Sequence, residues 1–151
     1  MRLGVISDTH ARDYWEISPR VLRILAGVDL IVHAGDFTEK SVLDGLGSLG
    51  EVQAVHGNMD SGDIKRLLPS TALFEAGGKR VGLTHGSGSP WGIAGRVRKM
   101  FGAADIIIFG HSHQPYNQLM DGCLLFNPGC ARNSCGIITI DDEVTGEIID
   151  I

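Results

Sequence analysis

The chain has 151 residues, of which 43% are hydrophobic and 21% are charged, and its formal net charge is −5. This balance excludes a disordered chain, and the length fits one domain over residues 1–151. No basic run is present, which argues against an extended nucleic-acid-binding surface. No stretch reaches the roughly 20 apolar residues of a membrane span, and the first apolar run is too short for a signal peptide.

The cysteines are odd in number and lack the paired spacing of a zinc knuckle. They are Cys123, Cys130 and Cys135. We therefore expect reduced thiols and a cytoplasmic protein, either a monomer or a homo-oligomer, without membrane contact.

The first half of the chain alternates apolar runs with helical patterns. The runs expected to form buried strands are residues 3–6, 30–32 and 52–55. Ser18 as N-cap and Pro19 after it predict a helix that Gly27 ends. Thr38 is expected to cap a second helix that runs to about Leu46. The resulting βαβαβ order is typical of an α/β fold.

The second half is richer in strand patterns. Gly77-Gly78 and Asp121-Gly122 each separate two such runs and predict a hairpin. One amphipathic helix, containing Ile93 and Val97, is expected to close near Gly102. The expected strands are residues 71–75, 80–84, 106–109, 116–120, 123–126, 136–140 and 147–151. Helices outside two sheets would satisfy the patterns of both halves.

Five of the apolar runs end, within a few residues, in side chains that can bind metal ions. These side chains are Asp8 and His10, Asp36, Asn58, His85, and His111 with His113. Because strand ends gather along one rim of an α/β sheet, we expect these residues to meet. Oxygen and nitrogen ligands without cysteine suit Mn, Fe, Zn, Co or Ni. A single His or Asp at a strand end is more often structural, but seven at five strand ends predict a metal site.

The order of these residues resembles the five-block signature of the calcineurin-like metallophosphoesterases. The blocks are Asp8-Thr9-His10, Gly35-Asp36, Gly57-Asn58-Met59-Asp60, Thr84-His85-Gly86 and Gly110-His111-Ser112-His113. The short length and the segment Asn127-Pro128-Gly129 are similar to the small YfcE-type phosphodiesterase group. The resemblance implies a four-layer α/β/β/α sandwich of two mixed sheets flanked by helices.

The resemblance also implies two divalent ions per chain, Mn first, with Fe, Zn, Ni or Co as alternatives. The implied ligands are Asp8, His10 and His113 for one ion, Asn58, His85 and His111 for the other, and Asp36 as a bridge that gives one oxygen to each. Such a pair can lower the pKa of a shared water and present hydroxide in line with phosphorus. The implied activity is hydrolysis of small phosphodiesters, such as a nucleotide, with Asp36, Asn58 and His85 as catalytic residues.

Two further residues are expected at the substrate. Met59 stands where many members of the superfamily carry a histidine thought to protonate the leaving oxygen, and methionine has no proton to give. We therefore expect a preference for diesters with good leaving groups. His56 shares strand parity with Asn58 and is expected to contact the substrate, with a solvated loop residue as the alternative. His33 is expected to be a structural residue of the core.

Two alternatives stay open. One is a non-catalytic scaffold that binds partner proteins, because the retromer sorting subunit resembles the same fold. Broken metal ligands would favour it, and all seven positions are intact. The other is a phosphomonoesterase, against which Met59 argues.

Overall fold

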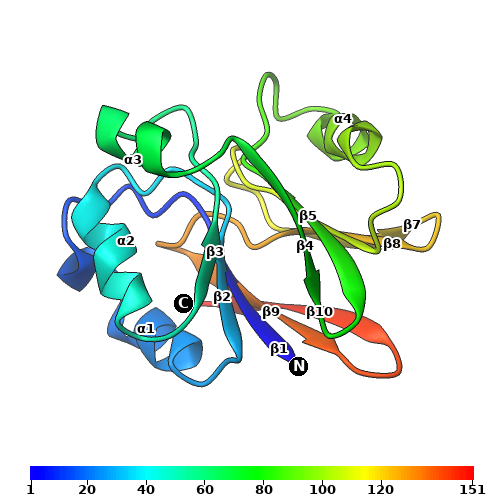
Figure 1. Ribbon diagram of the computed structural model, residues 1–151, viewed down its shortest axis with the longest axis horizontal. Helices are drawn as coiled ribbons and strands as arrows, with labels where there is room; N and C mark the ends of the chain where they lie inside the picture. The colour runs from blue at the N-terminus through cyan, green and yellow to red at the C-terminus, as the bar shows by residue number, and fades with distance from the viewer.

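The computed structural model describes residues 1–151, and its first sheet has five strands in the order β10-β9-β1-β2-β3 (Figure 1). The strands are β1 (Arg2–Ile6), β2 (Leu30–His33), β3 (Val52–Ala54), β9 (Ser134–Ile140) and β10 (Val144–Asp150). β1, β2 and β3 run parallel, and β9 pairs antiparallel with both β1 and β10. The parallel part corresponds to the predicted βαβαβ segment.

The second sheet also has five strands, in the order β4-β5-β6-β8-β7. They are β4 (Thr71–Ala76), β5 (Lys79–Thr84), β6 (Ile106–Ile108), β7 (Tyr116–Met120) and β8 (Cys123–Asn127). β5, β6 and β8 are parallel, whereas β4 and β7 join through hairpins. Both predicted hairpins are confirmed, at Gly77-Gly78 and Asp121-Gly122.

The helices cover the outer faces of the two sheets. They are α1 (Pro19–Leu25), α2 (Lys40–Gly47), α3 (Gly62–Leu67) and α4 (Ile93–Met100), with a 3₁₀ turn η1 (Tyr14–Glu16). α1 and α2 lie against the first sheet and α4 lies against the second (Figure 1). None of these helices combines the length and the apolar character needed to cross a membrane. The fold is therefore the predicted four-layer sandwich.

Alternation along the strands produces the layers. Leu3 and Val5 of β1 pack in the central core between the sheets, together with Val81 and Leu83 of β5. Ile6 belongs instead to the core under the first helical layer. Since successive strand residues point to opposite faces, each inner strand supplies side chains to two cores. The inner strands consequently read as continuous apolar runs.

The predicted start of α2 is wrong. Glu39 occupies the N-cap position, without a side-chain cap hydrogen bond, and the helix begins at Lys40. The Thr38 hydroxyl donates to the Ala11 carbonyl at 2.7 Å. Thr38 therefore ties the segment after β1 to the segment after β2 and is not free to cap a helix. The short α3 and η1 were not predicted, although Ser61 caps α3 by accepting from the Ile64 N–H at 3.4 Å.

The cysteines give a prediction of chemical reactivity. All three are free and buried, and burial raises the pKa of the Cys135 thiol from 9.0 to about 11. Only the thiolate attacks a disulfide reagent, and a shift of that size lowers the thiolate fraction about 100-fold. We expect Cys135 to react at mildly alkaline pH at least about 100-fold more slowly in the native chain than in the unfolded chain. Mass-resolved labelling with a disulfide reagent measures this, and rapid labelling of native Cys135 would contradict it.

Candidate metal centre

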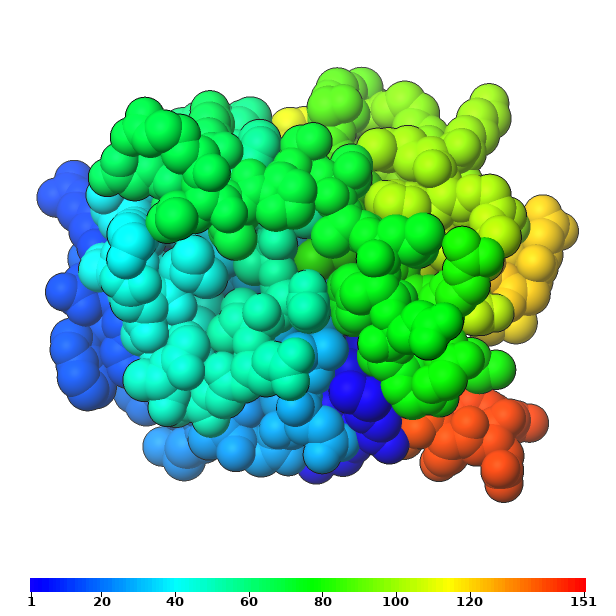
Figure 2. All heavy atoms as spheres, in the orientation of Figure 1, coloured from blue at the N-terminus to red at the C-terminus, as the bar shows by residue number.

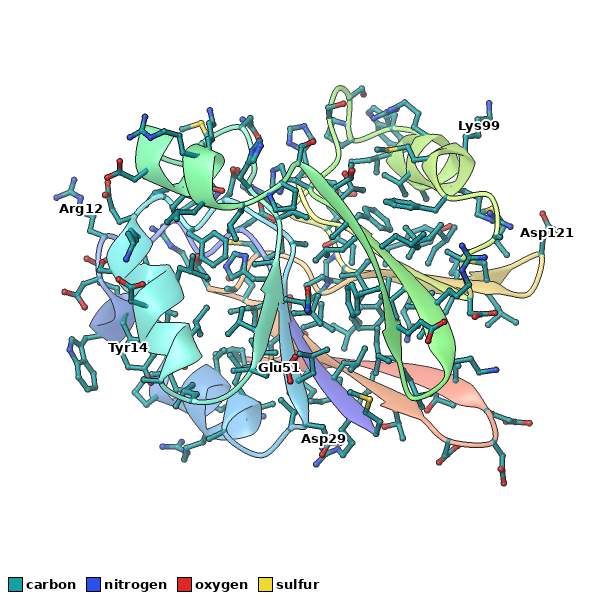
Figure 3. All side chains as sticks on the ribbon, viewed as in Figure 1. Arg12, Tyr14, Asp29, Glu51, Lys99 and Asp121 are labelled. Carbon is teal, nitrogen blue, oxygen red and sulfur yellow. The ribbon has the colours of Figure 1, made fainter.

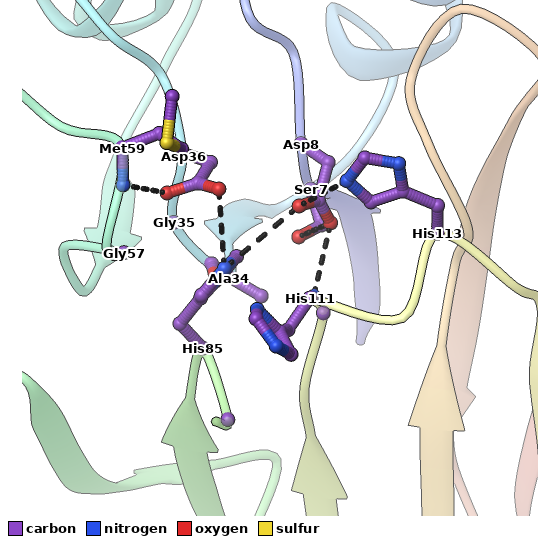
Figure 4. Close-up of polar contacts among 12 residues, drawn as sticks. Ser7, Asp8, Ala34, Gly35, Asp36, Gly57, Met59, His85, His111 and His113 are labelled. Carbon is purple, nitrogen blue, oxygen red and sulfur yellow. Dashed lines mark hydrogen bonds and ion pairs between the residues drawn. The ribbon is translucent and has the colours of Figure 1, made fainter. Parts of the chain in front are cut away.

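The candidate ligands lie where parallel strands of both sheets end. Asp8 follows β1 and Asp36 follows β2 in the first sheet, while His85 follows β5 and His111 follows β6 in the second. The loops that carry them meet at one rim of the sandwich (Figure 4). Residues from distant parts of the sequence thus share one site, as the strand-end pattern predicts.

Two groups of ligand atoms form at this rim, and both contain Asp8. The first joins Asp8, His10 and His113, and the second joins Asp8, Asp36 and His85. Asp8 Oδ1 lies 3.2 Å from His113 Nε2, 3.8 Å from His10 Nε2 and 3.8 Å from His85 Nε2. Asp36 Oδ2 lies 3.3 Å from His85 Nε2 and 3.8 Å from His10 Nε2. The ligand atoms therefore face a common space.

Three atoms that face this space are buried without a hydrogen-bond partner. They are Asp8 Oδ1, His10 Nε2 and His85 Nε2. A buried polar atom without a partner costs about 1–3 kcal/mol, so native proteins rarely leave one, let alone three together. A cation would satisfy all three, and their oxygen and nitrogen donors suit a divalent transition metal. The residues present therefore fit the implied ions.

Hydrogen bonds hold these side chains with one atom turned to the common space. Asp8 Oδ2 accepts from the Ser7 hydroxyl at 2.6 Å and from the His111 N–H at 3.2 Å. His85 Nδ1 lies 2.7 Å from the Ala34 carbonyl, which can only accept, so Nδ1 carries the proton. In the neutral ring, Nε2 then has the free lone pair. Such contacts behind the ligands set their orientation.

The geometry does not fit the expected bridge with one Asp36 oxygen per ion. Asp36 Oδ1 accepts the Met59 N–H at 2.8 Å (Figure 4). Only Oδ2 faces His10 and His85. A bridge between two ions would therefore use the single atom Oδ2. The sequence could not show this, because it depends on the backbone position of Met59.

Charge and burial oppose each other at the pair Asp36 and His85. Burial alone raises the pKa of the Asp36 carboxyl, but close contact with His85 and the Met59 N–H bring this pKa below its ordinary value. Burial likewise lowers the pKa of His85, but Asp36, Asp8 and the Ala34 carbonyl outweigh it and raise the pKa. The site thus favours a carboxylate facing positive charge.

The backbone is strained at the candidate ligands. Seven residues other than glycine have positive φ angles, and five of them are candidate ligands. These five are Asp8 (53°), His10 (44°), Asp36 (61°), His111 (68°) and His113 (59°). L-residues rarely adopt this region, and each instance costs of order 1–3 kcal/mol. Strain of this kind clusters at functional sites, which supports a site here.

Two motif glycines allow the loops to approach closely. A Cβ atom on Gly57 would overlap the Asp36 carboxylate. A Cβ atom on Gly110 would overlap the Ser7 hydroxyl and crowd Asp8 Oδ2. Glycine at both positions therefore keeps the two carboxylates in place.

Asn58 and His111 lie outside the two close groups. The Asn58 side chain is exposed and makes no hydrogen bond, while its carbonyl accepts from Lys65 Nζ at 3.1 Å. The His111 ring lies 5.2 Å from the His85 ring, and its Nε2 is 2.9 Å from the Gly88 carbonyl. Both residues are at the rim, but the described contacts do not place their ligand atoms with the others.

The two expected substrate residues flank Asn58 in the chain. His56 is half-buried and lines a cavity of about 300 Å³, whose other walls include Asn58 and His85 and contain no apolar residue. Met59 is 58% exposed, beside Asp36 (Figure 4). α3 and the segment that leads into α4 rise on either side of a dip in the surface (Figure 2). The site is thus open to solvent.

The contacts of His33 fit the structural role expected for it. The ring is buried, stacks on Phe37 at 3.5 Å and accepts the Gly35 N–H on Nδ1 at 3.0 Å. Burial, and then the charge of His85, lower the pKa of His33. A neutral ring is therefore favoured.

The sequence reasoning missed Asp60 as an organiser of the site. Its buried carboxylate accepts the N–H groups of Gly57 at 2.7 Å, Asp36 at 3.0 Å and Thr38 at 2.9 Å. It thereby fixes the Asp36 loop against the loop after β3. A carboxylate within the block Gly57-Asn58-Met59-Asp60 was the available signal.

Comparison with known proteins agrees with this geometry. A probable metallophosphoesterase from Methanothermobacter thermautotrophicus is 41% identical over 133 residues, which cover 85% of this chain and 76% of that protein. A phosphodiesterase from Methanocaldococcus jannaschii is 27% identical, over 93% of this chain and 90% of that protein. A mutant Vps29 from Entamoeba histolytica superposes with a TM-score of 0.78 at 25% identity, over 100% of this chain and 99% of that one.

A family model gives the broadest match. The model of the calcineurin-like phosphoesterase superfamily domain matches residues 1–141, which include every candidate ligand. Both sheets and all four helices lie wholly or partly within that range. The chain therefore belongs to the calcineurin-like phosphoesterase superfamily.

Proposed function

We propose that this chain is a metal-dependent phosphodiesterase that acts on small phosphodiesters at a binuclear centre. The observation that carries the proposal is the convergence of three unpaired buried ligand atoms, on Asp8, His10 and His85, at one rim. Membership of the superfamily and similarity to an archaeal phosphodiesterase support it.

The proposed ligands divide into two sets around Asp36. Asp8, His10 and His113 would hold one ion, and His85, His111 and Asn58 the other, with Asp36 Oδ2 between them. Two such ions, Mn in our first choice, would lower the pKa of a bound water and neutralise charge on the phosphate. Asn58 and His111 need only side-chain rotation or a small loop movement, since both already lie at the rim.

The protein's own residues orient the reaction. Asp8 and Asp36 bring two buried carboxylates close together, an arrangement that favours cations over any neutral ligand. The polar cavity beside His85 offers one arm of the ester a place to lie, with His56 and Lys65 on its walls. No acid stands at Met59, so the leaving oxygen departs without a proton from this position.

A panel of esters tests the proposal. We expect the metal-free chain supplied with Mn, Fe, Zn, Co or Ni to cleave bis(p-nitrophenyl) phosphate, and a chelator to stop the reaction. Matched p-nitrophenyl phosphate should be cleaved with a lower kcat/KM. The absence of diester cleavage with every metal would contradict the proposed activity.

His56 provides a prediction within this proposal. We expect His56→Ala to lower kcat/KM for diesters about tenfold, through loss of one polar contact, while metal content stays at the wild-type value. Kinetics and elemental analysis of the same sample separate the two effects. Lys99→Ala, at an exposed position of α4, is the control. Unchanged kinetics in His56→Ala would show that His56 is only a solvated loop residue.

A non-catalytic scaffold is the second candidate, favoured by the similarity to Vps29. The intact set of seven ligand-type residues supports the enzyme instead. The ester panel discriminates the two, because a scaffold requires no turnover.

A further inference from the structure

The loop between β5 and α4, residues 86–92, is rich in left-handed glycines and is here called the glycine loop. Gly86, Gly88 and Gly92 have φ angles of 89°, 77° and 73°. Glycine loses more conformational freedom on folding than any other residue, so such a loop has many competing conformations. Gly92 is also the N-cap of α4 and offers no side-chain cap. Other contacts must therefore hold the loop.

A single arginine makes those contacts. The Arg96 guanidinium donates to the carbonyls of Trp91 and Ser87, each at 2.8 Å, and to the carbonyl of Ser89. Its nitrogens also lie against Gly88 and Gly92, 3.5 and 3.6 Å from where Cβ atoms would stand. The planar fork of arginine suits several carbonyls at fixed angles, which the point charge of a lysine does not. Arg96 thus spans the whole loop from α4.

The glycine loop in turn contacts a candidate metal ligand. The Gly88 carbonyl lies 2.9 Å from His111 Nε2. A carbonyl can only accept, so Nε2 carries the proton and the neutral ring keeps its lone pair on Nδ1. The carbonyl therefore selects both the tautomer and the orientation of His111. No other side chain of the described structure makes a hydrogen bond to the His111 ring.

We propose that Arg96 is a positioning residue that, through the glycine loop, sets the Nε2–H tautomer of His111 and so presents Nδ1 to the second ion. The role for the ion rests on the proposed function, whereas the tautomer does not. Outer contacts of this type fix ligand histidines, and their loss typically lowers metal affinity about 10–100-fold.

Metal-free protein gives the direct test. We expect ¹⁵N NMR of the histidine rings, in mildly alkaline buffer, to show His111 as the Nε2–H tautomer in wild type. In Arg96→Ala this tautomer should lose its dominance, and in the control Lys99→Ala it should persist. Lys99 removes a charge from the same helix but extends away from the molecule (Figure 3). An unchanged tautomer in Arg96→Ala would overturn the proposal.

Metal binding adds a second readout. Titration with Mn²⁺, followed by calorimetry, should show one of two sites weakened about 10–100-fold in Arg96→Ala, with the other unchanged. Equal affinities in variant and wild type would overturn the role for the ion. Circular dichroism checks the fold, and Arg96→Gln replaces Arg96→Ala if that variant does not fold. A wild type that binds no ion contradicts the proposed function, while the tautomer comparison still decides the role of Arg96.

Discussion

Asp36→Ala is expected to lower kcat for diesters more than about 10³-fold, beyond the 10²–10³-fold cost of losing one transition-state contact. The reason is that Asp36 Oδ2 faces both His10 and His85 and is the one atom placed to serve both ions. Removing it should weaken both sites at once. Steady-state kinetics at saturating metal, with elemental analysis of the same samples, measures the effect.

The fold should survive this substitution. Asp36 is buried, and its Oδ2 accepts no hydrogen bond within the chain. Removing the carboxylate also relieves its repulsion with Asp8 in the metal-free protein, so we expect its thermal midpoint to be unchanged or higher. Asp44→Ala, an exposed carboxylate paired with Lys40, is the matched control and should retain full activity. A variant of Asp36 that keeps both ions and turns over normally would contradict the role given to Oδ2.

Met59→His is expected to raise kcat/KM for monoesters by at least about tenfold, given that general acid catalysis contributes 10²–10⁴-fold. The monoester brings more negative charge and needs a proton or a cation at its leaving oxygen. The Met59 N–H is anchored on Asp36 Oδ1, and the side chain is 58% exposed, so an imidazole has both position and space. Activity on a diester with a phenolate leaving group should change much less.

The comparison uses a mono- and a diester of one phenol, in wild type and variant, at a fixed concentration of one metal. Because the leaving group is the same, its intrinsic stability cancels from the ratio of the two rates. A wild type that already prefers the monoester would show that position 59 does not set the preference. So would a Met59→His variant without a monoesterase gain.

The layers of the fold were predictable from the sequence, because buried strands between two layers read as short apolar runs. Val5 and Leu83 sit in such runs and meet in the central core. Ser18 and Pro19 likewise predicted the start of α1, and Ser18 accepts the Arg20 N–H at 3.3 Å. Thr38 misled, since its cap-like chemistry is used for a tertiary contact to Ala11. Local propensity cannot distinguish these two uses.

The site was predictable as a set of residues but not as a geometry. Strand ends indicated that Asp8, Asp36 and His85 share a rim, and they do. The direction of each side chain depends on left-handed backbone angles and on partners such as the Ser7 hydroxyl, which no residue pattern reveals. For that reason the single-atom role of Asp36 Oδ2 and the contact of His111 with Gly88 emerged only from the structure.

The number and position of bound ions test the binuclear centre most directly. A crystal of the Mn²⁺-loaded chain, measured at the Mn absorption edge, should give two anomalous peaks per chain at this rim. Asp36 Oδ2 should lie within ligand distance of both, and His111 should bind through Nδ1. One peak, no peak, or a second peak away from Asp36 would contradict the binuclear site.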